Sequence, residues 1–113
     1  MVELAENDWD GYLRVLTIDA GGAPASVQMT PAGPDSEAAP RTPLRPLRGI
    51  GYARERDALE VAVGGSAQHG PSLRCFVSAP RRMLTEQRGG ELSIFVVRAG
   101  GERALVRILR DAR

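Results

Sequence analysis

The chain has few of the residue types on which enzymes and metal sites depend. Its 113 residues include one cysteine, Cys75, one histidine, His69, and no lysine. A single cysteine excludes an intrachain disulfide and a cysteine metal cluster, and it suits a reducing compartment. The missing lysine excludes a Walker phosphate-binding lysine, a Schiff base and a lysine general base. Many common catalytic and cofactor-binding arrangements are therefore impossible in this chain.

Long apolar segments are also missing. No stretch approaches the roughly 18 continuous apolar residues of a transmembrane helix. Residues 1–9 carry Glu3, Glu6 and Asp8 but no basic residue, which is the opposite of the basic start of a signal peptide. We therefore expect a cytoplasmic protein that does not enter a membrane and that uses no cofactor or metal.

A strong excess of basic charge is lacking as well. All fifteen basic residues are arginine, but fourteen acidic residues leave a formal net charge of only +1. Nucleic-acid-binding domains usually carry a marked basic excess. Codon bias in a GC-rich genome accounts for arginine in place of lysine, so we do not expect nucleic acid as a partner.

What the chain has in quantity is glycine and short apolar runs. It contains 13 glycines and 8 prolines, and only 4% of its residues are aromatic. From Leu47 to Leu109, short alternating apolar segments end in glycine-rich turns of about two to six residues, which are too short for a parallel crossover. The sequence therefore predicts a single all-β domain over residues 1–113. The expected fold is an antiparallel sandwich or partly open barrel of seven to eight short strands with little helix.

The expected strands follow from the alternation of apolar and polar residues. Tyr12–Asp19 and Ala25–Thr30 form the first predicted hairpin, and only Val2–Trp9 remains for a helical turn. The other predicted strands are 49–53, 58–63, 73–78, 83–86, 92–97 and 103–109, with Pro80 ending the third of these. Their inward positions predict a core of Leu59, Val61, Val63, Leu73, Cys75, Val77, Ile94, Val106 and Ile108.

One segment breaks this pattern. Residues Pro31–Pro46 contain five prolines and hardly any large apolar side chain. Such a composition offers little apolar area to offset the entropy lost on ordering. We therefore predict a proline-rich flexible loop within the domain and not a boundary between two domains.

The chain resembles a family of small bacterial domains of unknown function in three stretches, PLRGIGYARERDALEVAVGG, LRCFVSAP and ELSIFVVRAGGERALVRIL. The resemblance covers Tyr12–Leu109 and rests on structural motifs, which are a Pro-Leu-x-Gly-Ile step, an Asp-Ala-Leu-Glu-Val strand and a closing glycine hairpin. Members of the family carry a longer N-terminal helix, and a histidine where Cys75 stands here. The resemblance therefore implies an all-β fold and transfers no catalytic residue.

Candidate catalytic residues are scarce. Cys75 is the one candidate nucleophile and His69 the one candidate base. Cys75 shares its predicted strand face with Leu73 and Val77, where a thiol behaves as a small buried hydrophobe, and His69 lies in a glycine turn. Gly49-Ile50-Gly51 opens like a dinucleotide-binding fingerprint, but the third glycine and the helix after it are missing. We therefore assign no catalytic, cofactor-binding or metal-binding residue.

Three functions remain open. The favoured one is a non-enzymatic accessory or protein-interaction domain that self-associates through a strand edge, with Ala25–Thr30 and Arg103–Leu109 as the expected edges. The second function is binding of a small anionic ligand or nucleic acid, which requires one surface with Arg41, Arg45, Arg48, Arg54 and Arg56. A remote third is an enzyme based on Cys75.

The aromatic residues near the N-terminus have two interpretations. Trp9 and Tyr12 are either a partner anchor or a cover over an open end of the sheet.

Overall fold

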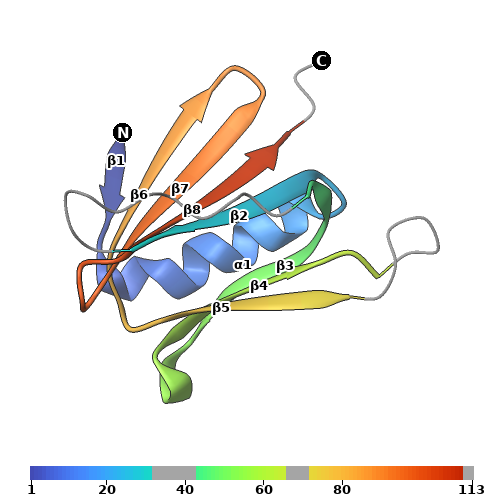
Figure 1. Cartoon of the computed structure of the whole chain (residues 1–113). Helices are drawn as coiled ribbons and strands as arrows, with labels where there is room; N and C mark the ends of the chain where they lie inside the picture. Colours follow the sequence, from blue (N-terminus) through green and yellow to red (C-terminus); the bar gives the residue numbers. More distant parts are fainter. Residues whose placement is uncertain (32–42, 66–71, 111–113) are drawn as a thin grey trace.

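The computed structural model describes residues 1–31, 43–65 and 72–110, and these form one antiparallel sheet with a helix (Figure 1). The sheet has eight strands in the order β1-β6-β7-β8-β2-β3-β4-β5, so it does not close on itself. The strands are β1 (Val2–Leu4), β2 (Pro24–Thr30), β3 (Arg45–Ala53), β4 (Ala58–Val63), β5 (Leu73–Ser78), β6 (Pro80–Arg88), β7 (Glu91–Arg98) and β8 (Arg103–Leu109). The other described elements are helix α1 (Trp9–Ala20) and the 3₁₀ turns η1 (Glu6–Asp8) and η2 (Arg54–Arg56). The predicted antiparallel all-β fold with little helix is confirmed.

The segment Tyr12–Asp19, predicted as a strand, belongs to α1, so the first predicted hairpin is wrong. The apolar residues of this segment fit both the alternation of a strand and the spacing of a helix. The helical spacing can be recognised only in the longer window from Trp9 to Ala20. A spacing of about three to four residues is the signature of a helix with one buried face. The buried positions of α1 are Trp9, Leu13, Leu16 and Ala20.

The N-terminal residues form a strand and a turn. Val2–Leu4 pairs with β6, and η1 supplies the helical turn expected within Val2–Trp9. Trp9 is 1% exposed, and its Nε1–H donates to the Leu4 carbonyl at 3.1 Å. Tyr12 is partly buried against the same core. Both aromatic residues therefore pack against the sheet and do not stand out as partner anchors.

The predicted loop Pro31–Pro46 falls mainly on residues 32–42, which lie outside the described residues. Its last two residues are part of the sheet, because Arg45 and Pro46 begin β3 and pair with Ala25 and Pro24 of β2. These pairs make up the whole β2–β3 ladder. The two strands are thus joined at one end only.

Beyond this short ladder β2 and β3 separate, and α1 lies in the gap between them (Figure 1). Thr17 takes the place of a neighbouring strand there. Its Oγ1 accepts the Ile50 N–H at 3.0 Å and lies 2.9 Å from the Ile50 carbonyl, to which it donates. The Leu13 carbonyl of the same helix lies 3.0 Å from this oxygen and shares its single proton. The helix thereby closes the free edge of β3.

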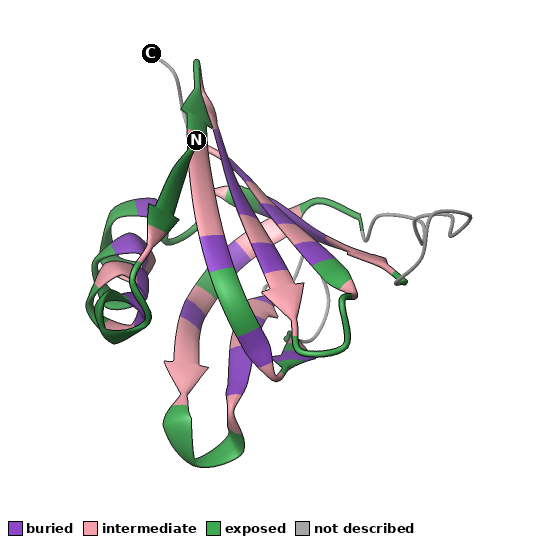
Figure 2. Cartoon of the chain, turned by 90° about the vertical axis from the view of Figure 1, so that its left-hand side faces the viewer, coloured by how far each residue is buried: buried purple, intermediate pink, exposed green. Residues whose placement is uncertain are grey.

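The separation divides the sheet into a large half (β1, β6, β7, β8, β2) and a small half (β3, β4, β5) that enclose one core with α1. Figure 2 shows buried and less buried residues alternating along the strands. Cys75 is only half-buried, and Leu73 is 43% exposed because it begins an edge strand, so its assignment to the core is wrong. The predicted core residues that are buried are Leu59, Val61, Val63, Val77, Ile94, Val106 and Ile108.

Ile94 and Leu73 are both predicted as core residues from the sequence, but they differ in burial. Ile94 is 0% exposed, so we expect Ile94→Ala to lower the free energy of unfolding by about 2 to 5 kcal/mol. Leu73→Ala should cost less than about 1 kcal/mol, because its side chain is already largely in water. Urea denaturation followed by the fluorescence of Trp9, the one tryptophan, measures both losses. Equal losses would contradict the placement of Leu73 at an edge.

The Thr17 hydroxyl can be tested by an almost isosteric change. Thr17→Val leaves both backbone groups of Ile50 without their partner, and we expect a loss of about 1 to 3 kcal/mol in the free energy of unfolding. Thr17→Ser keeps the hydroxyl and serves as the control, with a smaller loss. Urea denaturation of both variants provides the comparison, and a valine variant as stable as the serine variant would show that the hydroxyl contributes nothing.

Candidate interaction surface

The two strands predicted as edges both lie inside the sheet. Residues 25–30 pair with β8 along β2 and with β3 at the start of that strand, while residues 103–109 pair with both β2 and β7. The prediction is wrong because β8, the last strand along the chain, returns to pair with β2, an early one. The edges are β1 and β5, each with one neighbour, at opposite margins of the bent sheet (Figure 1).

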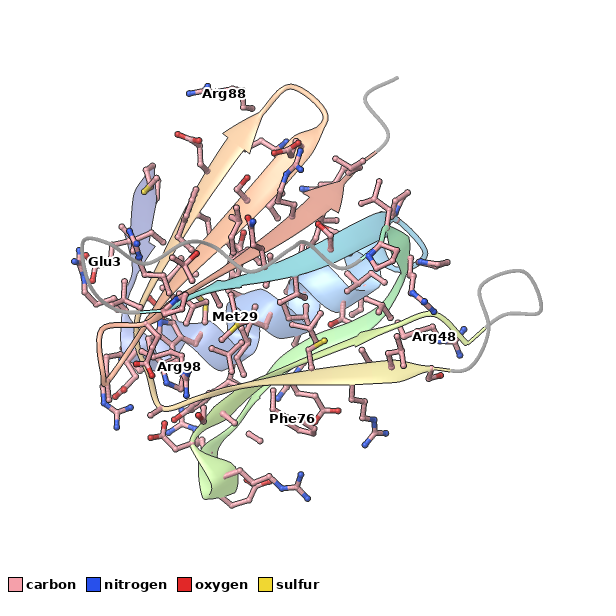
Figure 3. All side chains as sticks on the ribbon, in the orientation of Figure 1. Glu3, Met29, Arg48, Phe76, Arg88 and Arg98 are labelled. Atoms are coloured by element: carbon pink, nitrogen blue, oxygen red, sulfur yellow. The ribbon has the colours of Figure 1, made fainter. Side chains whose placement is uncertain are left out.

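The longer edge is β5, which has 6 residues against 3 in β1. It pairs with β4 from Leu73 to Ser78, and no described strand lies on its other side. Two large apolar side chains of β5 are exposed, Leu73 by 43% and Phe76 by 46%. Figure 3 shows Phe76 projecting from the outer face of β5, away from the core. This strand therefore combines an uncovered edge with apolar surface.

The direction of the backbone groups of β5 follows from the bond between Thr17 and Ile50. Because the N–H and C=O of Ile50 face the helix, those of its neighbours in β3 face β4, and the alternation carries through both ladders to β5. The residues of β5 whose groups face β4 are Leu73, Cys75 and Val77. Those whose groups face the free edge are Arg74, Phe76 and Ser78.

Arg98 closes one end of this edge. From the end of β7, its Nε donates to the Ser78 carbonyl at 2.9 Å and its Nη2 donates to the Ser78 hydroxyl at 2.6 Å. Ala79 then turns the chain with a φ of 51°, and Pro80 begins β6, so Pro80 does end the predicted strand. Within the described part of the chain, the outward backbone groups of Arg74 and Phe76 remain without a partner.

Charged side chains surround Phe76 on the outer face. The Arg56 guanidinium lies 5.9 Å from the ring centroid of Phe76, in cation–π contact. Arg74 Nε lies 3.4 Å from Glu60 Oε1, but the Arg74 side chain is 68% exposed, so this ion pair is weak. The outer face of β5 thus offers an aromatic ring that already accepts a guanidinium, with a second, exposed guanidinium beside it.

The structure does not show Cys75 beside a catalytic base. His69 lies outside the described residues, and Cys75 pairs with Val61 on the core side of β5, half-buried. Over residues 1–31, 43–65 and 72–110, no three His, Cys, Asp or Glu side chains are grouped so as to hold a metal ion. The thiol is therefore placed as a packing residue at the margin of the core.

The arginines of the anion-binding hypothesis do not share one surface where the structure describes them. Arg41 lies outside the described residues. Arg45 and Arg48 stand in the first half of β3, whereas Arg54 and Arg56 follow the end of this strand in η2. Most of the length of β3 separates the two pairs, and Figure 3 shows Arg48 at the end of the small half that lies away from the β5–β6 corner and Arg98.

A shallow groove of about 400 Å³ runs between α1 and the outer face of β3 and β4. Its floor is formed by Gly49 and Gly51, which have no side chains to fill it. Its described carboxylates are already paired, since Asp10 is 2.9 Å from an Arg14 nitrogen and Glu60 binds Arg74. The groove can therefore contact a ligand, but it presents no activated nucleophile.

A polar chain at the other end of β3 holds the hairpin turn in place. The rings of Trp9 and Tyr52 meet edge to face with centroids 5.4 Å apart, and the Tyr52 hydroxyl donates to Asp57 Oδ1 at 2.7 Å. Arg81 donates to Asp57 Oδ2 at 3.0 Å. The bonds from Tyr52 and then Arg81 hold the pKa of Asp57 below its ordinary value, and the bond to Asp57, with burial, raises the pKa of Tyr52.

Comparison with known proteins adds no relative. No protein-family model, curated protein or solved structure matches the chain. Among the described residues, no helix is long and apolar enough to cross a membrane. The geometry of the site is therefore the basis for a functional assignment.

The bond between Tyr52 and Asp57 makes stability depend on pH in two directions. The Asp57 carboxylate, with its lowered pKa, stabilises the fold above its unfolded pKa near 3.8, and this is lost as the pH falls through the folded value. The Tyr52 hydroxyl, with its raised pKa, stabilises the fold below its unfolded pKa near 10.0, and this is lost as the pH rises. Tyr52→Phe should therefore lower stability at neutral pH and flatten both limbs of the profile.

Tyr12→Phe is the matched control, because Tyr12 is the one other tyrosine and its hydroxyl donates to no carboxylate in the described part of the chain. Urea midpoints from about pH 3 to pH 11 give the profiles. The same profile for both variants would mean that the bond to Asp57 does not couple to folding.

Proposed function

We propose that this chain is a non-enzymatic protein-interaction domain that self-associates by strand pairing at the free edge of β5. The observation that carries the proposal is the open backbone of Arg74 and Phe76, flanked by the exposed side chains of Leu73 and Phe76. An uncovered strand edge is a template for another strand, and exposed apolar side chains add area that association removes from water. A cytoplasmic location suits this role, because Cys75 would remain reduced there.

Within the described residues, the edge of β3 and the edge strand β1 are less open than β5. The free edge of β3 is covered by α1 through Thr17. The edge strand β1 is short, and Glu3 in it binds Arg82 of β6 at 2.8 Å, which places charge at this margin. The end of β5 is closed by Arg98. Of the two edge strands in the described part of the chain, β5 is the longer, and its middle combines an open backbone with exposed apolar side chains.

The two alternatives have less support. An anion-binding surface requires grouped arginines, and the described ones stand at two separate places along β3. A Cys75 enzyme requires an activated thiolate, and Cys75 lies half-buried among apolar residues at the margin of the core. The described residues supply the open backbone and the exposed apolar side chains that association at β5 requires.

A proline at position 74 tests the proposal. Arg74→Pro removes an N–H that faces the free edge and leaves the ladder to β4 intact, since proline is tolerated at such positions of edge strands. We expect wild-type protein to form dimers at concentrations near 1 mM and Arg74→Pro to remain monomeric. Sedimentation equilibrium under reducing conditions, at protein concentrations from about 10 μM to about 1 mM, measures the difference.

Arg74→Ala is the control for the lost side chain, because it keeps the N–H. We expect it to dimerise more weakly than wild type and more strongly than Arg74→Pro. Urea denaturation followed by Trp9 fluorescence establishes that each variant is folded. Wild-type protein that stays monomeric near 1 mM, or a dimer that Arg74→Pro leaves unchanged, would refute the proposal.

A further inference from the structure

We infer that the two β5 strands pair in a single register, antiparallel about a two-fold axis at Cys75, so that Arg74 of each chain lies opposite Phe76 of the other. This inference rests on the proposed self-association and specifies its geometry. It follows from three constraints, which are the faces of the sheet, the direction of the open backbone groups and the charge of the side chains.

The faces of the sheet restrict where the axis can pass. A continuous sheet keeps the inner faces of both copies on one side, and residues directly opposite each other point to the same face. Residues of the inner face, such as Cys75, must therefore lie opposite inner residues, and outer residues such as Phe76 opposite outer ones. The axis then passes through a residue of β5 and not between two residues. The central candidates are Arg74, Cys75 and Phe76.

The backbone excludes an axis at Phe76. That register would place Arg74 opposite Ser78 of the second copy, in a pair whose backbone groups face each other. The Ser78 carbonyl already accepts a hydrogen bond from Arg98, and the chain turns away at Ala79 with a φ of 51°. The strand beyond Phe76 is thus unavailable for pairing.

Charge excludes an axis at Arg74. The two Arg74 side chains would lie directly opposite each other on the outer face, and like charges in this position destabilise a strand pair. The one acidic neighbour of Arg74, Glu60, belongs to the same chain and makes only an exposed contact at 3.4 Å. An axis at Cys75 avoids this repulsion.

The remaining register matches the open backbone groups of Arg74 and Phe76. Arg74 and Phe76 of one chain meet Phe76 and Arg74 of the other, and each pair exchanges both of its N–H···O=C bonds. The exposed Arg74 guanidinium reaches a Phe76 ring that already accepts Arg56 within its own chain. On the inner face, the exposed Leu73 lies opposite Val77 of the second copy, which adds a second apolar neighbour to the Val63 that it already faces in β4.

The same register places the two Cys75 residues opposite each other. Because the backbone groups of Cys75 face β4, this is a non-hydrogen-bonded pair, in which Cα atoms lie about 4.5 Å apart. That separation falls within the range that a disulfide can bridge. Cys75 is the one cysteine of the chain, so it reports this register without any substitution.

Oxidation of the native protein tests the pairing. Diamide accepts the two electrons and two protons that a pair of Cys75 thiols releases as the S–S bond forms. We expect a disulfide-linked dimer to form at least about tenfold faster than in the double variant Leu73→Cys, Cys75→Ser. In that variant the thiols of the two copies lie about four residues, or roughly 13 Å, apart along the paired strands.

Exchange of charges provides a second test by sedimentation under reducing conditions. Phe76→Arg places a guanidinium opposite Arg74 of the second copy, and we expect the association constant to fall by about tenfold or more. Adding Arg74→Glu places a carboxylate opposite that guanidinium and should restore association. In a register centred on Phe76 the added carboxylate would face Ser78 and restore nothing.

The outcomes separate this inference from the proposed function. A wild-type dimer that is broken by Arg74→Pro, with slow Cys75 cross-linking and no recovery in the double charge variant, would overturn the register and leave self-association at β5 in place. Wild-type protein that remains monomeric at the highest concentration, about 1 mM, would overturn both the register and the proposed self-association. Fast cross-linking together with recovery supports the register.

Discussion

Where β2 and β3 part, the backbone of β3 loses the neighbour that a continuous sheet would give it. The Thr17 hydroxyl supplies a substitute, since one oxygen accepts the Ile50 N–H and its proton is shared with the Ile50 carbonyl. Without such a partner the two groups would face the helix unpaired, which is costly away from water. This bond fixes the place of α1 between the two halves of the sheet. It also fixes which residues of β3, β4 and β5 turn their backbone groups toward each neighbour.

The open segment of β5 follows from this alternating direction of the backbone groups. Three places along the margin of the sheet are covered in different ways. Helix α1 lies along β3, an ion pair of Glu3 and Arg82 lies at β1, and the Arg98 side chain binds the end of β5. These devices leave a short stretch around Arg74 and Phe76 uncovered. For the self-association that we propose, this short open stretch restricts which strand segment and which register can pair.

The sequence predicts the strands well where one face is buried, as in β4, where Leu59, Val61 and Val63 alternate with less buried residues. It misleads at α1 because Val15 and Ile18 are apolar yet 58% and 79% exposed, which hides the helical period. The spacing from Trp9 to Ala20, ending at a glycine pair, is the signal that would have revealed the helix. The edges, and with them the candidate surface, depend on β8 returning to β2. No local pattern encodes that long-range pairing.

The candidate edge is also held firmly, and this bears on how it can function. Beyond Ser78, the Ala79 N–H donates to the Asp57 carbonyl at 2.7 Å, and Asp57 is bound in turn by Tyr52 and Arg81. Tyr52 packs on the buried ring of Trp9, so the end of β5 is tied to the helix and to β6. A preformed strand loses little conformational freedom when it pairs. For the proposed association, the shortness of the open segment limits the binding strength and favours a weak, reversible contact over a permanent one.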